Sequence, residues 1–128
     1  MNKIDWSQFK YFSKDEFICK CGCGCSNVSL KLLTIIEEAR ENAGIPFGIS
    51  SGCRCKKHNT EVGGKENSMH ICSVLTECNA VDIYCNTDRK RGIIVRSLFE
   101  AGVTHIGINF KENFIHADLD KRIALFPY

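Results

Sequence analysis

Three short apolar segments of the chain each carry a residue that can bind a transition metal. His70 follows Ser-Met, Asp82 lies within Ala-Val-Asp-Ile, and His116 lies within Phe-Ile-His-Ala-Asp. Neutral imidazole and carboxylate are common zinc ligands, and three protein ligands leave one coordination position for water. Such an open position is typical of catalytic zinc, which activates the bound water and polarises a carbonyl group. If these side chains converge, the sequence predicts a zinc-dependent hydrolase.

The hydrophobic pattern indicates two main helices and several short strands that would position these residues. Apolar residues recur at helical spacing between Ser29, a suitable N-cap, and Gly44, which predicts a helix over roughly 29–43. A second helix should begin after Thr87 and stop at Gly102. Strands are expected over residues 47–50, 80–84, 104–110 and 114–118, with the last two forming a hairpin. We therefore expect an α+β domain with a small mixed or antiparallel sheet.

Length and composition are those of one globular domain spanning residues 1–128. A chain of 128 residues can build one sizeable core but hardly two. Its net charge of +2 comes from scattered basic residues, which argues against a nucleic-acid partner. No segment reaches the ~18 apolar residues of a membrane span, and the N-terminus lacks the apolar run of a signal peptide. We expect cytoplasmic synthesis and a monomer.

The first 25 residues form a lead that is rich in aromatic residues and cysteine. Its aromatic side chains are expected to pack on the core: Trp6, Phe9, Tyr11, Phe12 and Phe17. Residues 51–69 are polar and contain several glycines, which predicts a loop with one helical turn.

The cysteines are numerous and odd in number: Cys19, Cys21, Cys23, Cys25, Cys53, Cys55, Cys72, Cys78 and Cys85. A secreted domain with so many cysteines would contain disulfides, whereas a chain without a signal peptide favours reduced thiols or a metal cluster. The series from Cys19 to Cys25 has Cys-x-Cys spacing rather than the Cys-x-x-Cys of a zinc ribbon. A second, structural metal, disulfides to Cys53, Cys55 or Cys85, and free buried thiols all stay open.

Several motifs occur together in an order typical of one peptidase family. Those ahead of Asp82 are Phe-Ser-Lys-Asp-Glu-Phe (12–17), Ser-Ser-Gly-Cys-Arg (50–54), His-Asn (58–59), Val-Gly-Gly (62–64) and Asn-Ser-Met-His (67–70). With Ala-Val-Asp-Ile and Phe-Ile-His-Ala-Asp, they make the chain resemble the zinc D-Ala-D-Ala carboxypeptidase family over roughly residues 9–128. The likeness is to its small branch of phage endolysins and bacterial cell-wall peptidases, and it implies the fold shared with the Hedgehog signalling domain.

The resemblance implies a site and a substrate. His70, Asp82 and His116 match the three ligands of a Zn²⁺ ion, and Arg54 matches the arginine that holds the substrate carbonyl or carboxylate. A guanidinium suits that role because it binds carboxylates in a bidentate manner. The implied reaction is hydrolysis of a peptide bond in peptidoglycan stem peptides, by a D-alanyl-D-alanine carboxypeptidase or an endolysin-type endopeptidase. Such an enzyme acts at the bacterial cell wall, and a phage-encoded one is released on lysis.

The general base is the part of the site where the chain departs from the family. Members often carry an acid three residues before the last histidine ligand, where this chain has Asn113. Asp118 lies two residues after His116, on the same strand face, and is our candidate for the base. Glu112 is the alternative base, and Asp118 would then orient a ligand or Arg54.

The gap between His70 and Asp82 is also longer than in the family. We interpret it as a loop insertion of about five residues, which costs little because closure entropy grows slowly with length. Cys72 and Cys78 would close this loop by a disulfide or pack as small apolar side chains. His58 and His105 are expected to be structural.

Two other functional classes stay open. The first is a non-catalytic, zinc-stabilised cell-wall-binding or interaction domain that keeps the fold. The second is a cysteine-rich metal-storage or redox protein. A catalytic Cys53 would need a partner histidine, and the sequence selects none.

Overall fold

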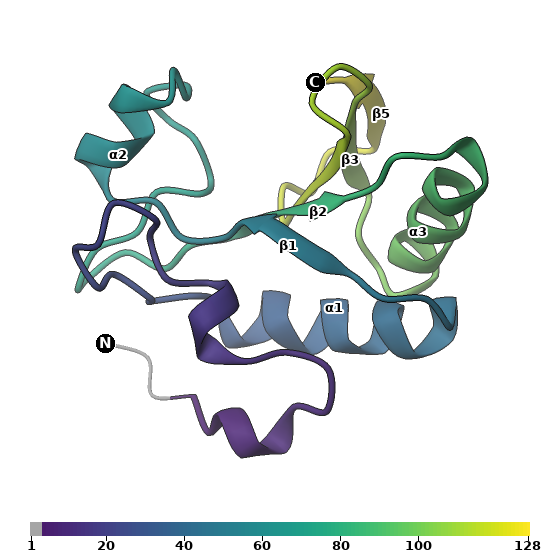
Figure 1. Cartoon of the computed structure of the whole chain (residues 1–128), viewed down its shortest axis with the longest axis horizontal. Helices are drawn as coiled ribbons and strands as arrows, with labels where there is room; N and C mark the ends of the chain where they lie inside the picture. Colours follow the sequence, from purple (N-terminus) through teal and green to yellow (C-terminus); the bar gives the residue numbers. More distant parts are fainter. Residues whose placement is uncertain (1–3) are drawn as a thin grey trace.

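The computed structural model describes residues 4–128; residues 1–3, the start of the expected lead, lie outside the described part. The elements in chain order are the 3₁₀ turns η1 (Trp6–Gln8) and η2 (Lys14–Glu16), then α1 (Leu30–Ala43), β1 (Gly48–Ser51), α2 (Lys56–Glu61), β2 (Ala80–Tyr84), α3 (Asp88–Glu100), β3 (His105–Asn109), β4 (Phe114–Asp118) and β5 (Ala124–Pro127). They form a single α+β domain, as the sequence pattern predicts (Figure 1).

The two long helices begin and end where their capping residues predict. Ser29 accepts a hydrogen bond from the backbone N–H of Leu32, and Gly44 closes α1 in the left-handed conformation, with φ 68°. Thr87 caps α3 in the same way by accepting from Lys90 N–H. The expected helical turn within residues 51–69 is the short helix α2.

The five strands form one mixed sheet in the order β1-β2-β4-β3-β5. The pairs β1/β2, β2/β4 and β4/β3 are antiparallel, whereas β5 runs parallel to β3. The sequence pattern does not predict β5. This four-residue strand ends at Pro127 and alternates only between partly and fully exposed residues, so its local pattern is weak and its pairing with β3 defines it.

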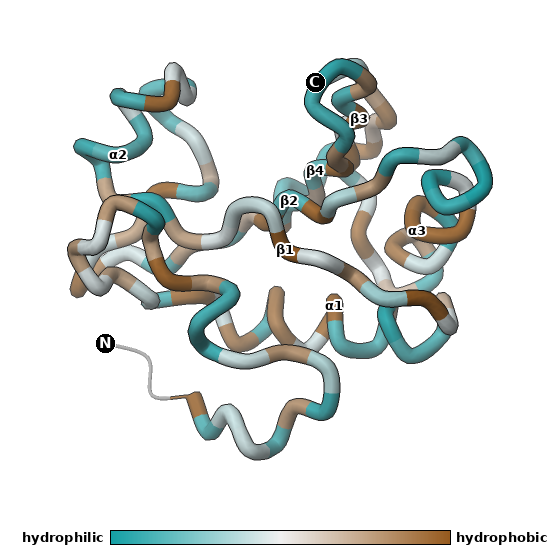
Figure 2. The backbone as a smooth tube through the Cα atoms, in the orientation of Figure 1, coloured by the Kyte–Doolittle hydropathy of each residue, from teal (hydrophilic) through white to brown (hydrophobic). Residues whose placement is uncertain are grey.

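Helices α1 and α3 contact each other and cover one face of the sheet (Figure 1). Their apolar side chains pack against those of β2, β3 and β4, and the fully buried residues include Leu33, Ile36, Leu98, Ile83, Ile106 and Ile115. Figure 2 shows the contrast with α2, which is mostly hydrophilic. Because successive side chains of a strand alternate between faces, the polar residues of β2 and β4 project away from the helices.

The N-terminal lead packs on the same core. Phe12 and Phe17 are buried, and the rings of Trp6 and Phe17 lie 5.5 Å apart, centroid to centroid. The Phe17 carbonyl accepts a hydrogen bond from Cys53 N–H, which ties the lead to the loop after β1. Within residues 4–128, no helix combines the length and apolar character that crossing a bilayer requires.

Candidate metal centre

The structure brings the three expected ligands together on the sheet face away from the helices. Asp82 and His116 lie directly opposite each other on β2 and β4, and His70 approaches from the loop that follows α2. His70 Nε2 lies 3.1 Å from Asp82 Oδ1, and His116 Nδ1 lies 2.9 Å from the same oxygen. Their donor atoms all fall within 4.8 Å of one another, and all three residues are buried.

In each of the two imidazoles, the nitrogen that does not contact Asp82 makes a hydrogen bond that fixes the orientation of the ring. His70 Nδ1 lies 2.7 Å from the Gly52 carbonyl, which can only accept, so this nitrogen carries the proton. His116 Nε2 lies 2.7 Å from Asp118 Oδ2 and donates to that carboxylate. Two lone pairs and one carboxylate oxygen therefore point at a common place, which favours a cation there.

These contacts fit zinc in both chemistry and size. A tetrahedral ion with bonds of about 2.0–2.1 Å has ligand atoms about 3.3 Å apart, close to the separations of 2.9 and 3.1 Å. In the protein without metal, a ring N–H can take the place of the ion on the side of each histidine that faces Asp82. Burial then opposes ionisation of Asp82, but the hydrogen bonds that such N–H groups of His116 and His70 donate outweigh it and hold its pKa at about 2. Burial likewise works to lower the pKa of His116, yet the bonds to Asp118 and Asp82 raise it. The site is thus built around positive charge.

Arg54 lies beside the centre and is held by three side chains. Its NH2 group lies 3.3 Å from Asp82 Oδ2, the carboxylate oxygen that the histidines do not contact. Its Nε donates to Ser51 Oγ at 3.2 Å, and NH1 donates to Asn59 Oδ1 at 3.1 Å. A guanidinium fixed in this way neutralises Asp82 and is pre-oriented for a ligand.

The backbone also joins Arg54 to His70. Arg54 N–H donates to the His70 carbonyl at 2.9 Å, and Gly64 allows the turn to pack closely, since a Cβ there would lie 2.9 Å from Arg54 NH1. The roles of Asn59 and Gly64 are not assigned by the sequence analysis. Their only signal is the occurrence of His-Asn and Val-Gly-Gly among the motifs around Arg54.

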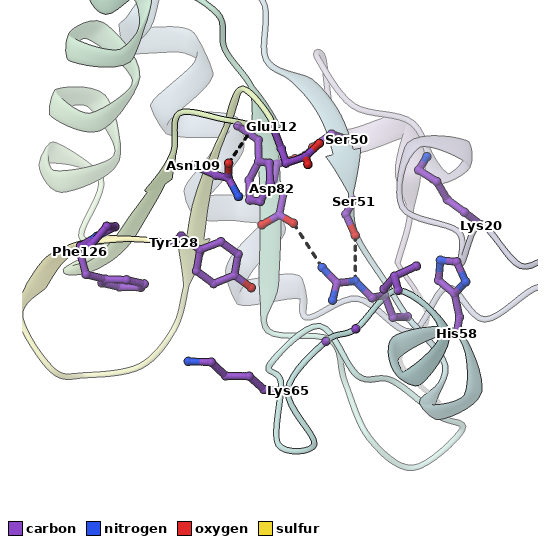
Figure 3. Close-up of a pocket in the computed structure, with 16 residues that line it drawn as sticks. Lys20, Ser50, Ser51, His58, Lys65, Asp82, Asn109, Glu112, Phe126 and Tyr128 are labelled. Carbon is purple, nitrogen blue, oxygen red and sulfur yellow. Dashed lines mark hydrogen bonds and ion pairs between the residues drawn. The ribbon is translucent and has the colours of Figure 1, made fainter.

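An open cleft of about 810 Å³ leads to Arg54 and Asp82. Figure 3 shows Lys20 and His58 on one side of Asp82, Phe126 on the other and Lys65 below, with the Arg54 bonds to Asp82 and Ser51 drawn as dashed lines. The Tyr128 ring stacks on His116, with 4.4 Å between ring centroids and 11° between planes. Burial raises the pKa of Tyr128, whose hydroxyl contacts Arg54.

Comparison with known proteins agrees with this geometry. A sequence model of the peptidase M15 family matches residues 10–118. The chain belongs to the peptidase M15 family. The matched segment contains the three converging residues and Arg54, and the match confirms the resemblance to zinc D-Ala-D-Ala carboxypeptidases that the motifs indicate. No curated protein matches the chain.

Within this family member, Asp118 holds His116 in place. Its buried carboxylate accepts from His116 Nε2, from His105 Nδ1 at 3.0 Å and from Asp120 N–H at 2.9 Å. Burial opposes ionisation, but the His116 bond and the other two lower the pKa of Asp118. A carboxylate that binds the outer nitrogen of a metal ligand orients that ligand. The base role of Asp118 stays a prediction, and these contacts favour the alternative role.

The two residues before β4 differ in where they lie. Glu112 is exposed and lines the cleft, with its backbone N–H bonded to Asn109 Oδ1 (Figure 3). Asn113 adopts a left-handed conformation, with φ 59°, and its Oδ1 accepts from Arg91 NH2 at 3.2 Å. The position where family members often carry an acid is therefore occupied by an amide bound to α3.

The segment between His70 and Asp82 forms a loop whose ends are fixed. Cys72 forms a disulfide with Cys25, and Cys78 is buried, with its thiol directed at the Ala80 carbonyl. Cys72 and Cys78 therefore do not pair with each other. Leu75, at the loop tip, is 93% exposed. His58 lies on α2, within 4.0 Å of Glu61, and also lines the cleft.

Proposed function

We propose that the chain is a zinc-dependent peptidase that hydrolyses peptide bonds in peptidoglycan stem peptides at the bacterial cell wall. The reaction would be that of a D-alanyl-D-alanine carboxypeptidase or an endolysin-type endopeptidase, and a phage-encoded enzyme released on lysis fits either. The observation that carries the proposal is the convergence of His70 Nε2, Asp82 Oδ1 and His116 Nδ1 beside an open cleft. Membership of the peptidase M15 family supports it.

The cleft has the charge that a peptide with free carboxylates requires. Its cations are Lys20, Lys65 and Arg54, and its carboxylates are Asp82, which pairs with Arg54, and the exposed Glu112, so the two lysines leave the cleft with a small excess of positive charge. Peptidoglycan stem peptides carry carboxylates, which these cations would hold near the centre. A bound zinc ion would supply an activated water and polarise the scissile carbonyl.

Three residues of the chain would have the other roles in the reaction. Asp118 keeps His116 in the tautomer whose Nδ1 faces the centre, and Arg54 meets the negative charge that develops on the substrate carbonyl oxygen. Asp82 and Glu112 are the two carboxylates that line the cleft, and Asp82 is already bonded to Arg54 and the histidines. Glu112 would therefore accept a proton from water and pass it to the leaving amine.

The roles of Asp118 and Glu112 can be separated by two variants. Asp118→Asn should weaken zinc binding about 10–100-fold, because His116 loses its orienting partner. Glu112→Gln should leave zinc affinity unchanged and lower kcat by about 10²–10⁴-fold, as expected for loss of a general base. Competition with a chromogenic chelator and steady-state kinetics at saturating zinc measure the two effects.

Asp120→Asn is the matched control for Asp118→Asn, because Asp120 pairs with Arg122 at the surface and lies two residues away. It should change neither quantity. If Asp118→Asn binds zinc normally and loses kcat, while Glu112→Gln stays active, Asp118 is the base.

Purified peptidoglycan tests the reaction itself. Incubation with the zinc-loaded protein should release new free amino groups, and treatment with a chelator followed by re-addition of Zn²⁺ should abolish and restore the release. Free amines are measured with an amine-reactive dye, and products are identified by mass spectrometry.

A second candidate function is a zinc-stabilised wall-binding domain. It is favoured by Asn113, whose side chain bonds Arg91 where family members often carry an acid. Co-sedimentation with peptidoglycan without amine release, with zinc present at the His–Asp centre, would establish binding and contradict hydrolysis.

A further inference from the structure

A second group of metal-ligating side chains lies outside the cleft, where the N-terminal lead meets the start of α2. Its members are Cys19, Cys21, Cys23 and Cys55, whose sulfurs all fall within 4.8 Å of one another. We infer that these four cysteines bind a structural zinc ion, separate from the His–Asp centre. The inference rests on the geometry of the cysteines and does not depend on the proposed function.

The sulfur separations are those of metal ligands. Cys19 Sγ lies 3.5 Å from Cys21 Sγ, which in turn lies 3.6 Å from Cys55 Sγ. Zinc–sulfur bonds of about 2.3 Å in a tetrahedron place neighbouring sulfurs about 3.8 Å apart. Disulfide sulfurs are bonded at about 2.05 Å, so these cysteines are gathered without being paired. Four protein ligands fill the coordination sphere, which is the arrangement of a structural rather than a catalytic ion.

Backbone N–H groups also point at the sulfurs. Cys25 N–H donates to Cys23 Sγ, Cys55 N–H to Cys19 Sγ and His58 N–H to Cys55 Sγ, each at 3.4 Å. Hydrogen bonds from N–H groups stabilise the thiolate form, which is the form that binds metal. Three of the four sulfurs therefore have the kind of partner that a zinc-bound thiolate has.

The glycines explain how Cys-x-Cys spacing can form such a site. Gly22 and Gly24 have φ of 87° and 83°, a region that favours glycine. Gly22 turns the chain back between Cys21 and Cys23, so that Cys23 can reach the same point as Cys19 and Cys21, and Gly24 turns it again toward Cys25, which pairs with Cys72. A Cys-x-x-Cys knuckle achieves this with a longer spacing.

Charge and exposure agree with a bound ion. One zinc ion with four thiolates carries a net charge of −2. Lys20 and Lys56 directly adjoin cysteines of the cluster in the chain, and Lys57 follows Lys56. Cys21 and Cys23 are exposed, where free thiols would oxidise readily. A metal ion would protect them.

The proposed ion would order one edge of the cleft. Cys55 directly follows Arg54, and Lys20, between two of the cysteines, lines the cleft. The ion would thereby fasten the N-terminal lead to the segment that carries Arg54 (Figure 1).

Zinc content per chain tests the inference. The wild-type protein, purified without chelators, should contain two equivalents, and the double variant Cys21→Ser/Cys23→Ser should lose one of them. Because both side chains are exposed, serine there should leave the folded chain intact unless they bind metal. Cys85→Ser, which changes a buried free cysteine away from the cluster, is the control for cysteine loss elsewhere in the chain and should retain two.

Cobalt identifies the ligands directly. Loading the His116→Ala protein with Co²⁺ should give the intense thiolate-to-metal charge-transfer bands of tetrahedral cobalt, and the double cysteine variant should lack them. A wild-type protein whose single zinc is lost on cysteine substitution, but kept in His116→Ala, would support this inference while contradicting the proposed function. Unchanged zinc content in the double cysteine variant, absence of thiolate bands, or intact-mass detection of disulfides among these four cysteines would overturn it.

Discussion

Replacing His116 with alanine should remove zinc from the His–Asp centre and lower peptide hydrolysis by about 10³-fold or more. The side chain supplies one of three converging ligands, and the two left, His70 and Asp82, do not make a catalytic zinc site. Activation of the carbonyl by the metal contributes several kcal/mol to the transition state, and about 1.4 kcal/mol corresponds to tenfold in rate. Loss of the ion therefore removes the largest single contribution.

Metal analysis and kcat/KM for a stem-peptide substrate, measured on the same preparation, check this result. His58→Ala is the control, because His58 is a half-buried histidine that lines the cleft but has its own contact with Glu61 and lies outside the His–Asp centre. It should keep the same zinc content as the wild type. A His116→Ala protein that retains full zinc content and hydrolysis would show that the assigned centre is wrong.

Replacing Arg54 with glutamine should lower both stability and activity, and the stability loss should depend on zinc. Without metal, the buried Asp82 loses its guanidinium partner, which costs about 3 kcal/mol in the free energy of unfolding. With zinc bound, the ion compensates the Asp82 charge, so the loss should be smaller. Because Arg54 lines the cleft and is proposed to meet the charge that develops on the substrate carbonyl, kcat/KM should fall by about 10²–10³-fold.

Urea denaturation with saturating zinc and with chelator measures the two stabilities. Arg96→Gln is the matched control: Arg96 forms an exposed pair with Glu100, whose loss should cost about 0–1 kcal/mol and leave kcat/KM unchanged. Equal destabilisation of Arg54→Gln in the two conditions would contradict the coupling between Arg54 and the metal. Unchanged hydrolysis would contradict its role toward substrate.

The parts of the fold that the sequence predicts are those with strong local signals. Ser29 and Gly44 define α1 because capping depends on a few adjacent atoms, and the apolar strands around Asp82 and His116 are defined by their own composition. The expected ligands meet because β2 and β4 are neighbours. The sequence indicates their convergence through the resemblance of the motifs to a zinc peptidase family, because the pairing of β2 with β4 joins segments that are distant in the chain.

What the sequence could not predict depends on contacts between distant segments. The role of Asp118 depends on which nitrogen of His116 faces the centre, and no residue pattern encodes this. Strand β5 is defined by its pairing with β3. Tyr128, which directly follows β5, is thereby placed where its ring stacks on His116. Pairing of Cys72 with Cys25 likewise joins segments whose distance in space only the fold determines.

The register of the central strands determines where the chain can accept inserted residues and where it cannot. Asp82 faces His116 directly across β2 and β4, so inserting one residue within either strand would turn a ligand toward the helices. The exposed stretch 73–77, between fixed Cys72 and Cys78, belongs to no strand, and Asn27 Nδ2 donates to the carbonyls of Ser73 and Thr76. Doubling the length of such a loop costs only about 0.6 kcal/mol. This stretch is therefore the natural place to graft a recognition peptide or a reporter onto the chain without moving the three residues proposed to bind zinc.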